Sequence, residues 1–125
     1  MLLEFSCSNH KSIRQKILFS TLAGKDNTGE KHLVNFGDIR VLKSSVIYGA
    51  NGSGKSNFIN AISFVKDLVL QSIKNQPGDG ISQTPHKLES SSSDSEYSLQ
   101  FVANNVRYAF GFTLNQHIIK EEYLY

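Results

Sequence analysis

An eight-residue glycine-rich motif is the part of this sequence with the clearest chemistry. Its residues are Gly49, Ala50, Asn51, Gly52, Ser53, Gly54, Lys55 and Ser56, a complete G-x-x-x-x-G-K-[ST] pattern. Glycines at this spacing let backbone N–H groups approach an anion closely, and a helix N-terminus adds further donors. The pattern predicts a phosphate-binding loop, in which Lys55 reaches the β- and γ-phosphates and the Ser56 hydroxyl helps to hold Mg²⁺. The alternative is an ordinary glycine-rich turn before a helix.

Two elements must flank the motif if it is to bind phosphate. The apolar run at residues 46–48 precedes it, and residues 41–48 are predicted to form the strand that delivers the loop. After Lys55, apolar residues recur at three- and four-residue steps, which predicts a helix with one face in the core. This face consists of Phe58, Ala61, Ile62, Val65, Leu68, Val69 and Ile73. Proline and glycine at residues 77–80 end the helical pattern.

Alternating apolar residues predict strands before the motif. Leu3, Phe5 and Cys7 alternate with polar neighbours, and residues 15–20 are predicted as a second strand. Residues 23–31 contain two glycines and several charges, which predicts a surface loop.

The C-terminal part of the chain changes to a two-residue period. Residues 75–95 are polar and include a serine run, so they form either a disordered linker or a docked loop. Residues 96–125 contain three alternating segments separated by two short turns, which predicts an antiparallel meander. Its aromatic residues are predicted to form one buried sheet face, with stacking against nucleic-acid bases as the alternative. The expected fold is therefore α/β, with strands, glycine motif and helix over residues 1–74, a polar loop over 75–95 and a β-subdomain over 96–125.

Composition limits the class of protein. The chain has 125 residues, 39% of them hydrophobic, which fits one domain with a core. Its net charge of +2 is too small to indicate nucleic-acid binding by itself. The single cysteine, Cys7, lies in a strand pattern and is predicted to be a buried structural thiol, with a reactive thiol as the alternative. Neither a membrane span nor a signal peptide is predicted, so a cytoplasmic protein without membrane contact is expected.

The motif and its surroundings resemble the N-terminal lobe of ABC-type ATPases of the SMC and RecF-like class. More narrowly, they resemble bacterial AAA-like ATP-binding proteins of the OLD and abortive-infection group. The resemblance rests on Ser-Asn-His-Lys-Ser-Ile at residues 8–13, on the motif with its flanks at 48–58, and on Ile-Asn-Ala-Ile at 59–62. The meander is similar to the β-subdomain beside the nucleotide in such ATPases. His10 departs from the family, which usually has an aromatic residue there; a neutral, partly buried histidine would fill this place.

The resemblance implies particular ligands and partners. It implies ATP and Mg²⁺ as ligands, with Asn57 included in the phosphate site. The family's basic residue falls on Lys11, which lies either near the nucleotide or in solvent as an ordinary lysine. It further implies a homodimer of ATPase heads, a nuclease or toxin partner, action on DNA, and a role in phage defence.

Hydrolysis requires groups that the sequence does not show. ABC-type enzymes need a strand ending in acidic residues and a signature loop, and neither pattern occurs here. Asp67 lies within the helical pattern and cannot substitute, so no catalytic residue is predicted in this chain. A parallel P-loop sheet needs several βαβ crossovers of roughly 30 residues each. The expectation is therefore the first part of a larger ATPase, or a truncated reading frame, that hydrolyses ATP poorly by itself.

Two other functions stay open. A non-catalytic module would keep the phosphate loop and act through protein contacts. A GTPase or small-molecule kinase is less consistent with the sequence, because no Asn-Lys-x-Asp guanine motif occurs and a meander follows the first helix.

Overall fold

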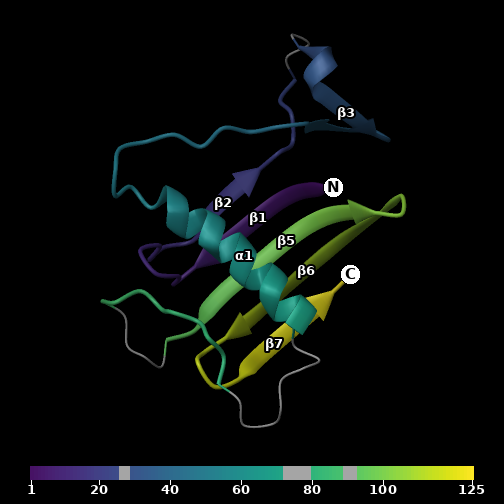
Figure 1. Ribbon diagram of the computed structural model, residues 1–125. Coiled ribbons are helices and arrows are strands. Elements are labelled where there is room, and N and C mark those ends of the chain that lie inside the picture. The colour runs from purple at the N-terminus through teal and green to yellow at the C-terminus, as the bar shows by residue number, and fades with distance from the viewer. Residues whose placement is uncertain (26–28, 72–79, 89–92) are drawn as a thin grey trace.

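The computed structural model describes residues 1–25, 29–71, 80–88 and 93–125, which form an antiparallel sheet, one long helix and a small hairpin (Figure 1). Described elements in chain order are β1 (Leu2–Ser8), β2 (Ile17–Ser20), η1 (Glu30–His32), β3 (Leu33–Phe36), β4 (Ile39–Leu42), α1 (Lys55–Gln71), β5 (Ser95–Ala103), β6 (Val106–Leu114) and β7 (Ile119–Leu124). The fold is thus mixed α/β, and each strand pairing in the described part is antiparallel.

The main sheet has the strand order β2-β1-β5-β6-β7. Strands β5, β6 and β7 form the antiparallel meander that the alternation predicts. Asn104 and Asn105 make the turn between β5 and β6 with φ of 49° and 63°, a left-handed conformation that asparagine tolerates better than most residues. Because β1 pairs with β5, the N-terminal strands and the meander share one sheet.

Helix α1 crosses one face of this sheet (Figure 1). Of the residues predicted for its apolar face, Phe58, Ala61 and Val65 are buried. Val69 is 48% exposed, and it lines an apolar cavity of about 430 Å³ between α1 and the sheet. Ile73 lies outside the described residues. Neither α1 nor another helix in the described ranges has the length and apolar character needed to cross a membrane.

The sequence does not predict the hairpin of β3 and β4. Val41 of this hairpin packs with Leu3 and Val102 in a second small core. Residues 29–31, part of the predicted surface loop over 23–31, lead into it through η1. A register shift between Leu2 and Glu4 in β1 accompanies this packing, since Leu2 packs against the main core and Leu3 against the second.

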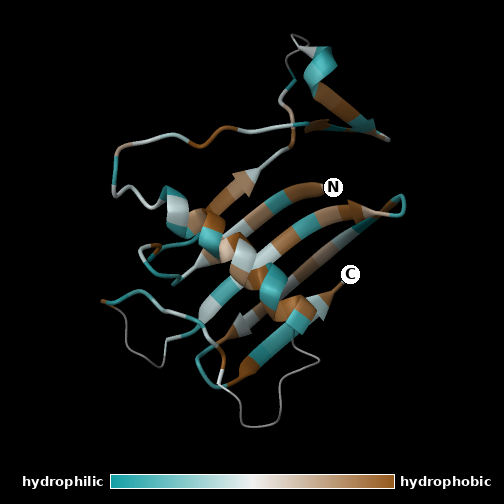
Figure 2. Cartoon of the chain, viewed as in Figure 1, coloured by the Kyte–Doolittle hydropathy of each residue, from teal (hydrophilic) through white to brown (hydrophobic). Residues whose placement is uncertain are grey.

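The predicted strand over residues 41–48 is wrong beyond Leu42. Residues 44–50 have no assigned strand and run as an extended segment towards α1 (Figure 1). Val46 is 83% exposed and Tyr48 is 89% exposed, and the apolar stretch is visible in this segment (Figure 2). Apolar residues alone do not make a strand; a neighbouring strand must accept the backbone hydrogen bonds. No such neighbour lies beside this segment within the described ranges.

The described part of the polar stretch at 75–95 is a docked loop. Gln83 is buried, and the carbonyl of Thr84 accepts a hydrogen bond from the N–H of Lys11 at 2.9 Å. Of the two alternatives for residues 80–86, the structure therefore shows the docked loop.

Candidate functional site

The glycine loop, defined here as residues 49–56, has a backbone that requires glycine at two positions. Gly52 has φ of +81° and Gly54 has φ of +94°, both in the left-handed region. Gly49 does not have such a φ; a Cβ there would lie 3.0 Å from Oγ of Ser53, so the requirement at this position is space. The N–H of Ser53 donates to the carbonyl of Ala50 at 3.2 Å and closes a turn within the loop.

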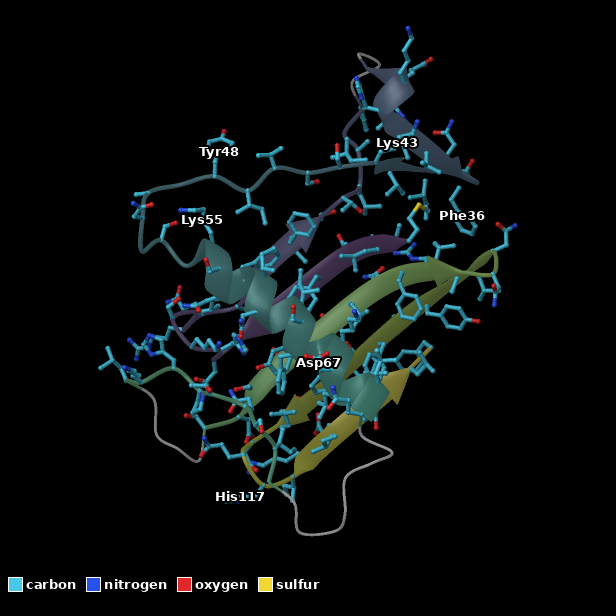
Figure 3. The ribbon with its side chains drawn as sticks, viewed as in Figure 1. Phe36, Lys43, Tyr48, Lys55, Asp67 and His117 are labelled. Atoms are coloured by element: carbon cyan, nitrogen blue, oxygen red, sulfur yellow. The ribbon has the colours of Figure 1, made fainter. Side chains whose placement is uncertain are left out.

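Lys55 bridges the loop that precedes it. Its Nζ donates to the carbonyl oxygens of Gly49 and Ala50, each at 2.7 Å. The ammonium group therefore lies over the start of the loop and holds its two ends together. Figure 3 shows Lys55 at the beginning of α1 and Asp67 further along the same helix. Asp67 is thus separated from the loop, as its place in the helical pattern predicts.

The first backbone N–H groups of α1 follow the glycine loop directly and have no partner within the helix. The first bond of the helical ladder runs from the N–H of Phe58 to the carbonyl of Gly54 at 2.9 Å. The N–H groups of Lys55, Ser56 and Asn57 precede this bond and have no partner in the helical ladder. No acidic residue occupies the first turn of α1, so no carboxylate competes with an anion for the positive end of the helix dipole.

A second loop contacts the start of α1. The 9–13 turn, between β1 and β2, places Oγ of Ser12 2.7 Å from Nδ2 of Asn57, which donates to it. The same Oγ lies 3.2 Å from where a Cβ on Gly54 would be. Lys11 donates from Nζ to Oδ1 of Asn60, the next helical turn. The structure thus places Lys11 beside α1, about one helical turn beyond the loop and apart from Lys55.

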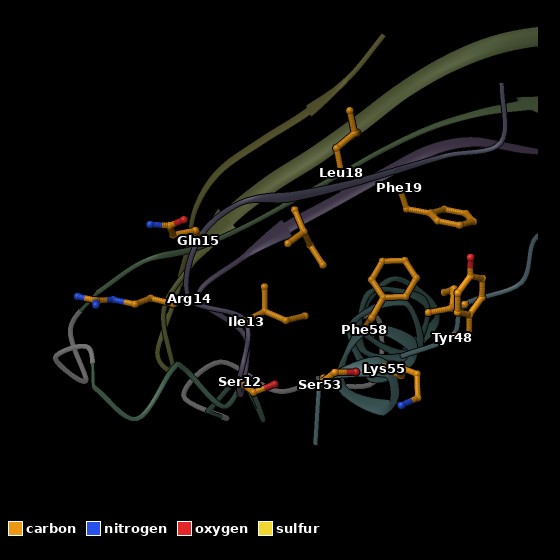
Figure 4. Close-up of a pocket in the computed structure, with 13 residues that line it drawn as sticks. Ser12, Ile13, Arg14, Gln15, Leu18, Phe19, Tyr48, Ser53, Lys55 and Phe58 are labelled. Atoms are coloured by element: carbon orange, nitrogen blue, oxygen red, sulfur yellow. The ribbon is translucent and has the colours of Figure 1, made fainter. Parts of the chain in front are cut away.

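A cavity of about 590 Å³ adjoins the glycine loop. Its walls come from the 9–13 turn, from β2 and from the start of α1, together with the segment before the loop. Rings of Phe19, Phe58 and Tyr48 gather on one side, while Ser12, Ser53 and Lys55 lie at the other (Figure 4). The cavity therefore combines an aromatic side with a polar end that includes the motif lysine.

Three buried titratable groups lie in or beside the 9–13 turn and stay uncharged at neutral pH. Burial, with a smaller contribution from the charge of Lys11, lowers the pKa of His10 to about 4. Its Nδ1 shares a hydrogen bond of 2.8 Å with the hydroxyl of Tyr97, whose pKa is raised by burial. The ring also packs against Phe64 of α1, so a neutral histidine fills the place usually taken by an aromatic residue. Cys7 is buried and burial raises its pKa to about 11, which confirms the predicted structural thiol.

Sequence reasoning found the glycine loop but missed the role of Ser12. The loop, Asn57 and Ser12 come together, whereas Lys11 contacts Asn60 instead. The position of Ser12 in the sequence, directly after Lys11, is the signal that could have indicated this role. No cluster of three or more His, Cys, Asp or Glu that would hold a metal occurs among the residues with described positions.

Comparison with known proteins gives one family match. The family described as "AAA domain, putative AbiEii toxin, Type IV TA system" matches residues 44–125, which include the glycine loop, α1 and the meander. No curated protein and no solved structure matches the chain. Because the match covers about two thirds of the sequence and includes the complete phosphate-loop motif, the chain belongs to this family of AAA domains, which have a P-loop ATPase-like fold.

Proposed function

We propose that this chain binds ATP together with Mg²⁺ through the glycine loop. The observation that carries the proposal is the loop itself, which joins left-handed glycines to the N-terminus of α1. Backbone N–H groups and the helix dipole favour a polyphosphate at this point. Lys55 already lies across the loop and would exchange its carbonyl partners for phosphate oxygens or add phosphate to them.

Ser56 is the residue that would hold Mg²⁺. Its side chain is exposed directly after Lys55, and a hydroxyl oxygen is a ligand type that Mg²⁺ accepts. When bound, the metal would neutralise charge on the phosphates and orient them. The chain's own contribution is to place the ammonium group and the hydroxyl on consecutive residues at the start of a helix.

The adjoining cavity would receive the nucleoside. A nucleobase has two apolar faces and polar edges, and it stacks well on aromatic rings. Phe19, Tyr48 and Phe58 offer such rings next to the polar end of the cavity. This arrangement supports a nucleotide as the ligand in preference to inorganic phosphate alone.

We further propose that the chain acts within an ABC-, RecF- or OLD-like ATPase head. Hydrolysis requires acidic groups that position metal and water. The described lining of the cavity contains no Asp or Glu, so hydrolysis would depend on segments or subunits that complete the site. By resemblance, two heads would then close on ATP in the cytoplasm, with a nuclease, toxin or DNA as partner in phage defence.

A non-catalytic nucleotide-binding module is the second candidate, and the same lack of acidic residues in the described lining favours it. Both candidates require ATP binding and differ in hydrolysis. A GTPase or kinase would instead prefer another nucleotide or transfer phosphate to a small molecule.

Calorimetric titration of ATP with Mg²⁺ tests the shared claim. Lys55→Met removes a charge-assisted contact with phosphate. The Kd of this variant for ATP with Mg²⁺ is therefore expected to be about ten- to a hundredfold higher than that of wild type. Lys66→Met is the matched control, because it removes one exposed lysine from the same helix away from the loop. Equal affinity in wild type and Lys55→Met, or no binding by wild type, contradicts the proposal. Phosphate release separates the ATPase from the non-catalytic module only when it is measured with the segments or subunits that complete the site, because this chain alone is expected to hydrolyse ATP poorly under both candidates.

A further inference from the structure

Asn9 lies at the centre of a buried hydrogen-bond network behind the glycine loop. Asn9 is 5% exposed. Its side-chain Nδ2 donates to the carbonyls of Ser93 and Asp94, each at 3.1 Å. Its Oδ1 accepts from the N–H of His86 at 2.8 Å. Both amide hydrogens and the amide oxygen are therefore used, and losing any of them leaves a buried polar group unpaired.

The backbone of Asn9 is held by two further buried side chains. Its carbonyl accepts from Nε2 of Gln83 at 3.0 Å and from Oγ of Ser95 at 2.6 Å. Gln83 also donates to Ser95 at 2.6 Å. The Asn9 cluster, defined as Asn9, Gln83 and Ser95, thus joins the start of β5 and the 80–86 segment to the 9–13 turn.

The 9–13 turn depends on this support. Asn9 has φ of 53° and Lys11 has φ of 51°, both left-handed, which residues other than glycine adopt at a cost in free energy. Within the turn His10 and Ile13 exchange two backbone hydrogen bonds, of 2.8 and 2.7 Å. The N–H of Lys11 bonds outward to Thr84 at 2.9 Å. The surroundings therefore hold the turn in a conformation that it would not favour by itself.

The opposite side of the turn contacts the start of α1, directly after the glycine loop. Ser12 accepts the hydrogen bond from Asn57, and its Oγ lies 3.2 Å from where a Cβ on Gly54 would be. A shift of the turn therefore moves the oxygen that accepts the hydrogen bond of Asn57, and it changes the space beside Gly54.

We propose that Asn9 is a positioning residue for the nucleotide site, acting through the 9–13 turn and Ser12 on the glycine loop. This inference rests on the proposed function, since it assigns Asn9 to the same site. Asn9 itself touches neither the glycine loop nor its lysine; its partners lie in the 80–86 segment and at the start of β5. The polar loop after α1 thereby becomes part of the support of the site.

Hydrogen exchange of the ligand-free protein tests the link without any nucleotide. Asn9→Asp keeps an acceptor for His86 and tolerates the left-handed φ, but it turns an oxygen towards the two carbonyls. Amide exchange at Ser53 and Phe58, whose N–H groups are hydrogen-bonded within the glycine loop and the first helical turn, is expected to rise by about fivefold or more, because a supporting contact is lost. Ser6→Ala is the matched control; it removes a buried hydrogen bond to Ser98 and should leave these amides unchanged.

Nucleotide titration then tests whether the link matters for binding. Asn9→Asp is expected to raise the Kd for ATP with Mg²⁺ by about tenfold, with circular dichroism showing a folded protein. In a Ser12→Ala background the same substitution should have a much smaller effect, because the route through Ser12 is already removed. A purely structural role for Asn9 predicts equal effects in both backgrounds. If Asn9→Asp does not fold, Gln83→Met removes one support of the turn and replaces it in the same measurements.

The outcomes separate this inference from the proposed function. Unchanged exchange at Ser53 and Phe58 in a folded variant overturns the inference, as does an effect on Kd that is the same with and without the Ser12 hydroxyl. If wild type does not bind ATP but exchange rises as expected, the proposed function fails and the mechanical link from Asn9 to the glycine loop stands.

Discussion

At the scale of single residues, the glycine loop depends on two positions that side chains cannot easily occupy. Gly52 and Gly54 both have left-handed φ, and Gly54 also faces Ser12. The side chain of Lys55 connects the end of the loop to its start by donating hydrogen bonds to the carbonyls of Gly49 and Ala50. The local chemistry is thus a tightly wound backbone with one cation placed over it, as anion binding requires.

Gly54→Ala is expected to lower both stability and nucleotide affinity. Alanine at φ of +94° costs about 1–2 kcal/mol, and its Cβ would lie 3.2 Å from Ser12 Oγ. The loss should appear in the free energy of unfolding in urea and in the Kd for ATP. Gly24→Ala is the control: Gly24 has no left-handed φ and nothing within 4 Å of a Cβ, so a change within about 0.5 kcal/mol is expected. Equal behaviour of the two variants would falsify this account of Gly54.

At the scale of elements, α1 is fastened to the sheet by aromatic contacts near its N-terminus. Phe58 meets Phe5 of β1 edge-on with ring centroids 5.8 Å apart, and Phe19 of β2 at 5.4 Å. Because Phe58 also lines the cavity beside the glycine loop, the same ring joins core packing to the candidate site. Fixing the start of α1 fixes the direction of its free N–H groups.

Phe58→Ala is expected to lower the free energy of unfolding by about 3–5 kcal/mol, since a buried aromatic ring is lost and a cavity remains. Urea unfolding followed by circular dichroism measures this change. Ile59→Ala is the neighbouring control, because Ile59 is 54% exposed and should cost much less. A cost for Phe58→Ala no larger than that for Ile59→Ala would contradict the proposed packing.

The segment before the glycine loop shows what an element needs besides composition. Residues 46–48 are apolar and would suit a buried strand, yet Val46 and Tyr48 are largely exposed. A strand is stable only when a neighbour shares its backbone hydrogen bonds and its side chains are covered. In the described ranges this segment has neither, so it stays extended without becoming part of the sheet.

At the scale of the whole molecule, one antiparallel sheet collects segments from both ends of the chain. β1 lies between β2 and β5, and α1 covers the face that carries the main core. Buried polar groups also link distant parts of the chain in this region. His10 and Tyr97 share a hydrogen bond although they are 87 residues apart in the sequence. Protonation of such a group affects the folding equilibrium of the entire molecule.

The protein is expected to lose stability as the pH falls from about 6.5 to about 4. The pKa of His10 is about 4 in the folded protein and 6.5 as the ordinary value. Between these values the unfolded chain binds the proton and the folded protein does not, so acid favours unfolding. The contribution is complete above pH 6.5 and disappears as the pH approaches 4.

His10→Phe tests the assignment, because it fills the same apolar place without a titratable group. Its free energy of unfolding should fall less steeply between pH 6.5 and 4 than that of wild type. His117→Phe, at an exposed turn before β7, is the control and should keep the wild-type slope. The same slope in His10→Phe and wild type would show that another group causes the acid sensitivity.

The sequence by itself determined the features that depend on neighbouring residues. The glycine motif, the helix from Lys55 and the meander of β5 to β7 all follow from short-range spacing, because backbone φ, helical period and turn residues are local properties. Buried Cys7 follows from the alternating strand pattern around it, whereas a neutral His10 is an expectation from the family resemblance, which places an aromatic residue there.

Only the tertiary structure decided which segments meet. It placed β1 against β5, formed the β3–β4 hairpin, left residues 44–50 outside the sheet, and brought Asn9 to His86, 77 residues later in the chain. These features depend on strand partners and on burial of polar groups far apart in sequence, for which no short pattern carries the information. Hydrogen bonds between distant segments form only when the whole chain has packed, and this packing set the position of Ser12 beside the glycine loop.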